Sequence, residues 1–147
     1  MDGRGTNPAA VEHFGDVGGP TYPDRMIGTW DALIIDCPDP GALARFYAEI
    51  LPMRVVEEED DWATLASGPD ARPLLAFQRV QGDYTAPRWP GQDVPQQMHI
   101  DVKVDDMDAA EQQVLALGAV KAGFDRETFR VYLDPAGHPF CLIMPND

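Results

Sequence analysis

The 147-residue sequence has little cysteine, little positive charge and no long apolar stretch. Two cysteines are too few for the disulfide framework of a small secreted domain. No apolar run approaches the roughly 20 residues that a transmembrane helix needs. The first residues do not combine a basic stretch with an apolar run, as a secretory signal does. We therefore expect a cytoplasmic protein that does not enter membranes.

Acidic side chains greatly outnumber basic ones. The chain has 25 Asp and Glu against 11 Lys and Arg, and its formal net charge is −14. Such a charge repels nucleic-acid backbones and anionic lipid surfaces, so we expect neither as a partner. It would attract a cationic ligand, although solubility alone accounts for the charge of most acidic proteins.

Composition divides the chain into an arm and one folded domain. Residues 1–27 are rich in Gly, Pro and Asp and lack apolar periodicity, which predicts a flexible N-terminal arm. Residues 28–147 are expected to form the domain. Within it, residues 81–96 form a long irregular segment that predicts a linker between a first half at about 28–80 and a second at about 97–145.

The first half predicts a strand, a helix and three further strands. Residues 30–35 are mostly apolar, and Asp39-Pro40 then provides an N-cap with proline at the first helical position. An apolar helix stripe at the spacing i, i+3, i+4, i+7 consists of Leu43, Phe46, Tyr47 and Ile50. The remaining strands are predicted over residues 53–58, 61–67 and 74–79. The acidic run 57–61 predicts a solvated connection rather than a metal site.

The second half repeats this order at an offset of 67 residues. Ala32 then corresponds to His99, and Asp39 to Asp106, while Gly118 is expected to end the second helix. Strands are predicted near residues 119–124, 128–133 and 139–144. A recurring order of this kind indicates a duplicated unit. We predict an α+β fold of two tandem β-α-β-β-β modules.

Strand alternation in the second half separates an apolar face from a polar one. If Met98, Ile100 and Val102 face the helix, the polar residues on the other face are Gln97, His99, Asp101 and Lys103. A neutral imidazole can bind metal or transfer protons near neutral pH, although a lone histidine is more often structural. Cys141 lies in an apolar strand without a nearby positive charge to lower its pKa, which favours an inert thiol.

Three segments resemble a known superfamily. Asp36-Cys37-Pro38-Asp39-Pro40 and the helix after it, Gln96–Asp101 with Val104–Ala110, and Asp134–Phe140 are similar to the vicinal oxygen chelate superfamily, which has the glyoxalase/bleomycin-resistance/extradiol dioxygenase fold. The resemblance covers residues 29–145, and the glyoxalase-like branch is the nearest in pattern. It implies a curved mixed sheet around a central cavity that binds a small molecule, and a homodimer.

The resemblance also implies where a metal ion would bind. In metal-dependent members four strand positions converge on one divalent ion, and the matching residues here are Ala32, Gln78, His99 and Cys141. Ala32 has no ligand atom, and Cys141 stands where the family usually has Glu. Hard cations prefer oxygen ligands, and Zn²⁺ would find only two good ligands. We expect no metal cofactor, with a weakly held divalent ion as the alternative.

Three functions are compatible with these residues. The first, which we favour, is metal-free binding of a cationic or aromatic molecule, as in bleomycin-resistance proteins. The second is a lyase or isomerase with His99 as general base and Asp101 or Gln78 orienting the substrate. The third is a metal-dependent glyoxalase-like enzyme in which water replaces the missing ligand. In each case the residues expected to line the cavity are Trp30, Gln78, His99, Asp101, Tyr132 and Cys141.

Overall fold

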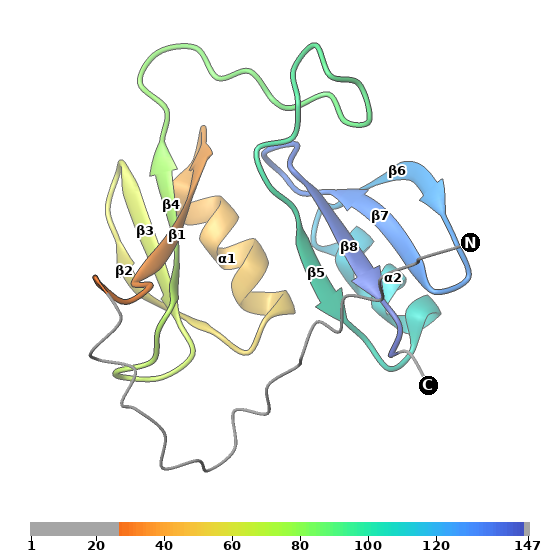
Figure 1. Ribbon diagram of the computed structural model, residues 1–147, viewed down its shortest axis with the longest axis horizontal. Coiled ribbons are helices and arrows are strands. Elements are labelled where there is room, and N and C mark those ends of the chain that lie inside the picture. The colour runs from red at the N-terminus through yellow and green to blue at the C-terminus, as the bar shows by residue number, and fades with distance from the viewer. Residues whose placement is uncertain (1–26, 146–147) are drawn as a thin grey trace, which may run out of the picture.

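The computed structural model describes residues 27–145, and the predicted arm, apart from Ile27, lies outside the described residues (Figure 1). The first module consists of β1 (Ala32–Cys37), α1 (Pro40–Ile50), β2 (Arg54–Glu58), β3 (Trp62–Ala66) and β4 (Leu74–Arg79). The second consists of β5 (Ile100–Lys103), α2 (Met107–Ala116), β6 (Val120–Asp125), β7 (Phe129–Leu133) and β8 (Pro139–Ile143). The predicted order of elements is confirmed in both halves.

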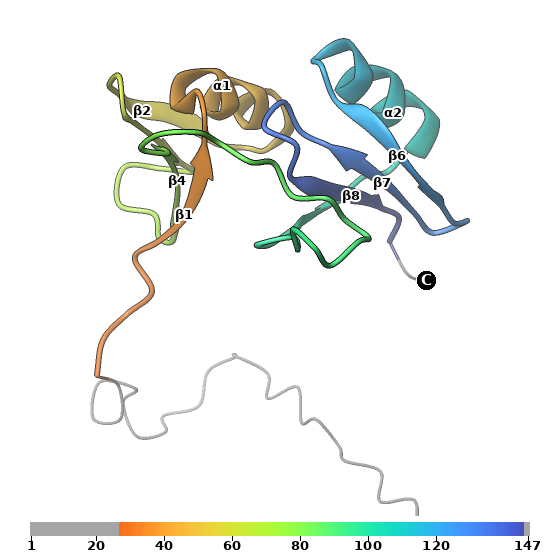
Figure 2. The same cartoon turned by 90° about the horizontal axis from the view of Figure 1, so that it is seen from above.

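Each module forms its own four-stranded mixed sheet. The strand orders are β1-β4-β3-β2 and β5-β8-β7-β6, with the first pair of each sheet parallel and the others antiparallel. Both helices lie on the same side of the two sheets (Figure 2). The sheets stay separate within the described residues, and they close no barrel. None of the helices in this part of the chain is both long and apolar enough to cross a membrane.

Both helices begin at the predicted aspartates. The side chain of Asp39 accepts a hydrogen bond from the backbone nitrogen of Ala42 at 3.1 Å, and Asp106 accepts one from Ala109 at 3.0 Å. These bonds satisfy backbone donors that the first helical turn leaves free. Gly118 follows α2 with φ +107°, a conformation that a side chain would strain.

Helix α1 packs on both modules. The ring centroids of Phe46 and Tyr47 lie 5.7 and 6.2 Å from that of Phe140 in β8, and Tyr47 also stacks on Phe77 of β4. These four rings are buried. The apolar stripe predicted for the first helix therefore covers its own sheet and also contacts β8, an inner strand of the neighbouring sheet, which makes the hydrophobic core continuous.

Buried hydrogen bonds cross the same boundary. The hydroxyl of Tyr47 donates to Oδ2 of Asp134 at 2.6 Å, and Oδ1 accepts from the backbone nitrogens of Ala136 and His138. Burial raises the pKa of Asp134, and the Tyr47 hydrogen bond opposes that rise. Nε2 of His138 lies 2.7 Å from the carbonyl oxygen of Asp36, which can only accept, so this nitrogen carries the proton. The β7–β8 connection is thus bonded to both β1 and α1.

The expectation that Tyr132 faces the cavity is wrong. Tyr132 pairs with Phe140 in the β7–β8 ladder and shares its face, which is the face that α2 covers. Its hydroxyl donates to Oε2 of Glu111 on α2 at 2.5 Å. The parity was misassigned because Val131 and Leu133 are as apolar as Tyr132, while Arg130, which pairs with Glu111 at 3.0 Å, puts a charge on the helix side.

We predict that Tyr47→Phe destabilises the protein by about 1–3 kcal/mol, because the buried Asp134 carboxylate loses a donor. The hydrogen bond favours the charged carboxylate, so this cost is largest above the folded pKa of Asp134 and shrinks as the pH falls through it. Tyr132→Phe is the matched control and should cost less, since Glu111 keeps Arg130 and Lys121. Denaturant unfolding of both variants at neutral and acid pH tests this; equal costs would contradict it.

Candidate functional site

Polar side chains gather on the open face of the second sheet, by which we mean the face turned away from α2. Asp101 of β5 and Cys141 of β8 are direct partners in the parallel ladder, so their side chains emerge side by side. His99 lies two residues before Asp101 and shares its face. Nε2 of His99 is 3.6 Å from Oδ1 of Asp101, and ligand atoms of all three residues lie within 4.8 Å of one another.

These three residues border a shallow pocket of about 340 Å³. The other residues that line it are Thr128, Phe129, Ile143 and Met144. The side chains of His99 and Asp101 are 45% and 51% exposed, so neither is held by core packing. An imidazole beside a carboxylate is suited to accept and pass on a proton.

The Cys141 thiol is not an activated nucleophile. Burial raises its pKa to about 11, and the charge of Asp101 and a hydrogen bond to that carboxylate act in the same direction. The thiolate is the reactive form of cysteine, and little of it exists at neutral pH. The site therefore favours acid–base chemistry or ligand binding over covalent catalysis.

The open face of the first sheet, which is the face turned away from α1, has no metal-binding side chains at the positions that match His99 and Cys141. Ile34, which corresponds to Asp101 at the 67-residue offset, pairs with Ala76 in the β1–β4 ladder. Ala76 therefore occupies the position of Cys141, just as Ala32 occupies that of His99. Gln78 lies two residues further along β4, beside Asp36, and is not at the ligand position that the resemblance gave it.

A metal centre of the superfamily type does not fit these residues. Such a centre takes ligands from both modules, and the first module places two alanines at its two positions. Hard ions such as Mg²⁺ and Mn²⁺ need several oxygen ligands, and Asp101 is the only oxygen donor of the three residues gathered in the second module.

The structure brings together three of the six predicted site residues. His99, Asp101 and Cys141 share a pocket. Gln78 is exposed on the open face of the first sheet, between Asp36 and Trp62 in the ladders. Trp30 precedes β1, is 65% exposed, and donates from Nε1 to the carbonyl oxygen of Ala32. The six residues expected to line one cavity therefore do not converge, and only the three of the second module share a pocket.

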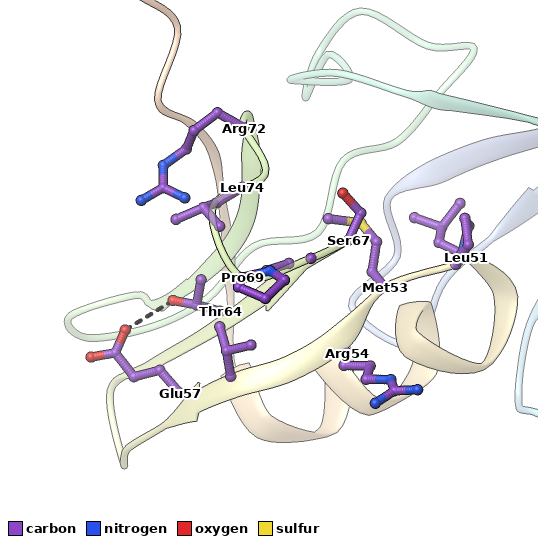
Figure 3. A pocket seen from close by; sticks show the side chains of 13 residues that line it. Leu51, Met53, Arg54, Glu57, Thr64, Ser67, Pro69, Arg72 and Leu74 are labelled. Atoms are coloured by element: carbon purple, nitrogen blue, oxygen red, sulfur yellow. Dashed lines mark hydrogen bonds between the residues drawn. The ribbon is translucent and has the colours of Figure 1, made fainter.

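A larger pocket, of about 1030 Å³, lies on the first module (Figure 3). It is bounded by the open face of β2 to β4, the α1–β2 connection and the β3–β4 connection. Its lining residues are Leu51, Pro52, Met53, Arg54, Val56, Glu57, Thr64, Ala66, Ser67, Gly68, Pro69, Arg72 and Leu74.

The sequence did not reveal this pocket, because Glu57 was assigned to a solvated acidic run. A register shift between Val55 and Glu57 places Glu57 opposite Thr64. The Thr64 hydroxyl donates to Oε2 of Glu57 at 3.0 Å and accepts from Nε1 of Trp62 at 2.8 Å. A bulge of one residue has no clear sequence signal here, and it decides which carboxylate of the run faces the pocket while remaining exposed.

Comparisons with known proteins agree with this architecture. Among solved structures, a glyoxalase/bleomycin resistance protein/dioxygenase family enzyme from Burkholderia phytofirmans matches with TM-score 0.59 and 16% identity over 80% of this chain and 98% of that one. Glyoxalase I of Leishmania major matches with TM-score 0.58 and 20% identity over 80% and 86% of the two chains. The fosfomycin resistance protein FosX of Mesorhizobium loti gives TM-score 0.58 and 17% identity over 82% and 94%.

Identities this low show the fold alone. No curated protein matches the chain significantly. The family model described as a glyoxalase-like domain, however, matches residues 32–143, which include every helix and strand of both modules. The chain belongs to the glyoxalase-like domain family.

Proposed function

We propose that this protein binds a small organic molecule on the open faces of its sheets, without the metal centre typical of the superfamily. The observation that carries the proposal is the pocket of about 1030 Å³ on the first module. Ligand pockets typically measure about 300–1,000 Å³ and combine mostly apolar walls with a few polar groups. This pocket has such walls, with Glu57 and Thr64 as its hydrogen-bonded polar pair.

The apolar part of the pocket wall suits an aromatic ligand, whereas the attraction for a cationic ligand comes from the acidic protein as a whole and not from the wall, which includes Arg54 and Arg72 beside Glu57. Val56, which is 61% exposed, lines the pocket together with Pro69 and Leu74, and these side chains give an aromatic ring apolar groups to contact. Arg72 is already paired with Asp31 at 2.7 Å. The net charge of −14 attracts cations to the protein as a whole. Sequestration of an organic compound in the cytoplasm, as in bleomycin-resistance proteins, is the role we infer.

Two open faces of different chemistry also suggest how the protein assembles. The first module presents Trp30 and Ile34 to solvent, and the second presents the polar set of His99, Asp101 and Cys141. We propose that the protein is a homodimer in which burial of exposed apolar groups on β1 stabilises the association.

A lyase or isomerase is the second candidate function. Its support is the distance of 3.6 Å between Nε2 of His99 and Oδ1 of Asp101. The carboxylate would orient the imidazole and stabilise its protonated form after His99 has taken a proton from the substrate. This function requires the substrate to reach the small pocket of the second module.

Ligand binding can be tested by native mass spectrometry of gently purified protein, followed by titration of the compound that is found. We predict that Val56→Arg weakens its binding at least tenfold, because a charge replaces an apolar side chain in the pocket wall. Leu115→Arg, at a position on α2 with 38% exposure, is the control and should bind as the native protein does. Equal affinity in all three proteins would place the ligand elsewhere.

The role of His99 can be separated from its contribution to stability. We predict that His99→Ala changes the melting temperature by no more than a few degrees, because the side chain is half exposed. Leu142→Ala, in the core beside it, should cost about 2–5 kcal/mol. Turnover lost in His99→Ala with ligand affinity retained would favour the enzyme over the binding protein.

Hard metal ions should not bind at a defined site. We predict well under one Mg²⁺ or Mn²⁺ per chain by elemental analysis of protein purified without chelators, because the first module offers alanine at both ligand positions. Millimolar Mg²⁺ should leave the melting temperature unchanged. One tightly held Mn²⁺ per chain would restore the metal-dependent glyoxalase-like enzyme as the preferred function.

A further inference from the structure

We propose that His99, Asp101 and Cys141 form a binding site for Zn²⁺ that lies entirely within the second module. This site shares His99 and Cys141 with the positions of the superfamily's metal centre, but it takes its third ligand from Asp101 and none from the first module. It does not depend on the organic ligand proposed above, which the pocket of the first module would hold.

The backbone already places the three donors together. Asp101 and Cys141 are ladder partners, so their Cβ atoms are held by main-chain hydrogen bonds on adjacent strands. The donor atoms lie within 4.8 Å of one another, and one pair is at 3.6 Å. Tetrahedral Zn²⁺ with bonds of about 2.0–2.3 Å puts its ligand atoms roughly 3.3–3.8 Å apart. The widest separation, at most 4.8 Å, must therefore shorten by about 1 Å when the ion binds.

The donor types select the metal. One imidazole, one carboxylate and one thiolate suit Zn²⁺, whereas Mg²⁺ and Ca²⁺ need more oxygen atoms than this cluster offers. Asp101 is the decisive residue, since His99 and Cys141 alone give only two good ligands. Residues that line the same pocket include no lysine or arginine that would compete for the carboxylate.

The fourth coordination position is open. The pocket of about 340 Å³ lies over the three donors, and Thr128 and Met144 are among the residues at its border. Three protein ligands with one exchangeable position are the arrangement of zinc sites that bind water or a substrate oxygen. His99 and Asp101 are half exposed, so the ion exchanges with solvent and the affinity is moderate rather than that of a closed structural site.

Binding must release the proton of the Cys141 thiol. Zn²⁺ binds the thiolate form of cysteine, so the apparent affinity for Zn²⁺ rises with pH. A site made only of carboxylates would show no such dependence near neutral pH, because its ligands are already ionised.

The test uses the full chain after removal of metal with a chelator. Zn²⁺ is titrated by calorimetry at two pH values, and Co²⁺ is titrated in parallel, because a cobalt–thiolate bond gives a charge-transfer absorption. We expect one Zn²⁺ per chain and a cobalt–thiolate band. Asp101→Asn and His99→Ala should each lower the Zn²⁺ affinity at least tenfold, and Cys141→Ser should abolish the band.

Glu59→Gln, in the exposed acidic run, is the matched control and should leave zinc binding unchanged. The proposal is overturned if Asp101→Asn binds Zn²⁺ as the native protein does, or if the cobalt–thiolate band survives in Cys141→Ser. It also fails if Glu59→Gln weakens binding as much as Asp101→Asn, which would show diffuse attraction to acidic groups. Melting curves of the metal-free variants confirm that each is folded, and the organic-ligand titration with Val56→Arg is read independently.

Discussion

The packing of α1 across both modules is the contact on which the rest of the structure depends. Each four-stranded sheet is small, and α2 buries only Met107 and Val114 among its ten residues. Helix α1 therefore buries more apolar side chains than α2 does, and its Phe46 and Tyr47 contact Phe140 of the second module. The Tyr47–Asp134 hydrogen bond at 2.6 Å fixes this contact in one orientation, because a buried carboxylate without its donors would be costly. The open faces are free to vary only because the core on their other side is shared.

That freedom explains how two copies of one unit came to carry different chemistry. The backbone presents equivalent positions at Ala32 and His99, at Ile34 and Asp101, and at Ala76 and Cys141. The half-exposed side chains of Ile34, His99 and Asp101 make few packing contacts, so their substitution costs little stability. The first module has small or apolar side chains at these positions, and the second has polar ones. The second module therefore carries a cluster of acid–base and metal-binding groups that the first module lacks.

Much of this could be predicted from the sequence, and the failures have definite physical causes. Element order, both N-caps and the apolar helix stripe follow from local periodicity, which tertiary contacts here reinforce. Tyr132 was misplaced because β7 has apolar residues on both faces and a charged Arg130 on the helix side. Gln78 was misplaced because only the β1–β4 register distinguishes it from Ala76. The pairing of Glu57 with Thr64 depends on a bulge, and the Tyr47–Asp134 contact joins residues 87 positions apart.

The protonation state of Cys141 connects the alternatives for the second module. Because the Cys141 thiol is protonated, it adds no second negative charge beside Asp101. The carboxylate of Asp101 can therefore orient His99 as a base. Metal binding is incompatible with this role of His99. The ion displaces the proton of the thiol and occupies the imidazole lone pair that a base would use. His99 cannot bind Zn²⁺ through Nε2 and accept a proton there at the same time. Acid–base catalysis by His99 and metal binding are therefore mutually exclusive states of one cluster, and zinc, if it binds as inferred, would inhibit the former while leaving the pocket of the first module untouched.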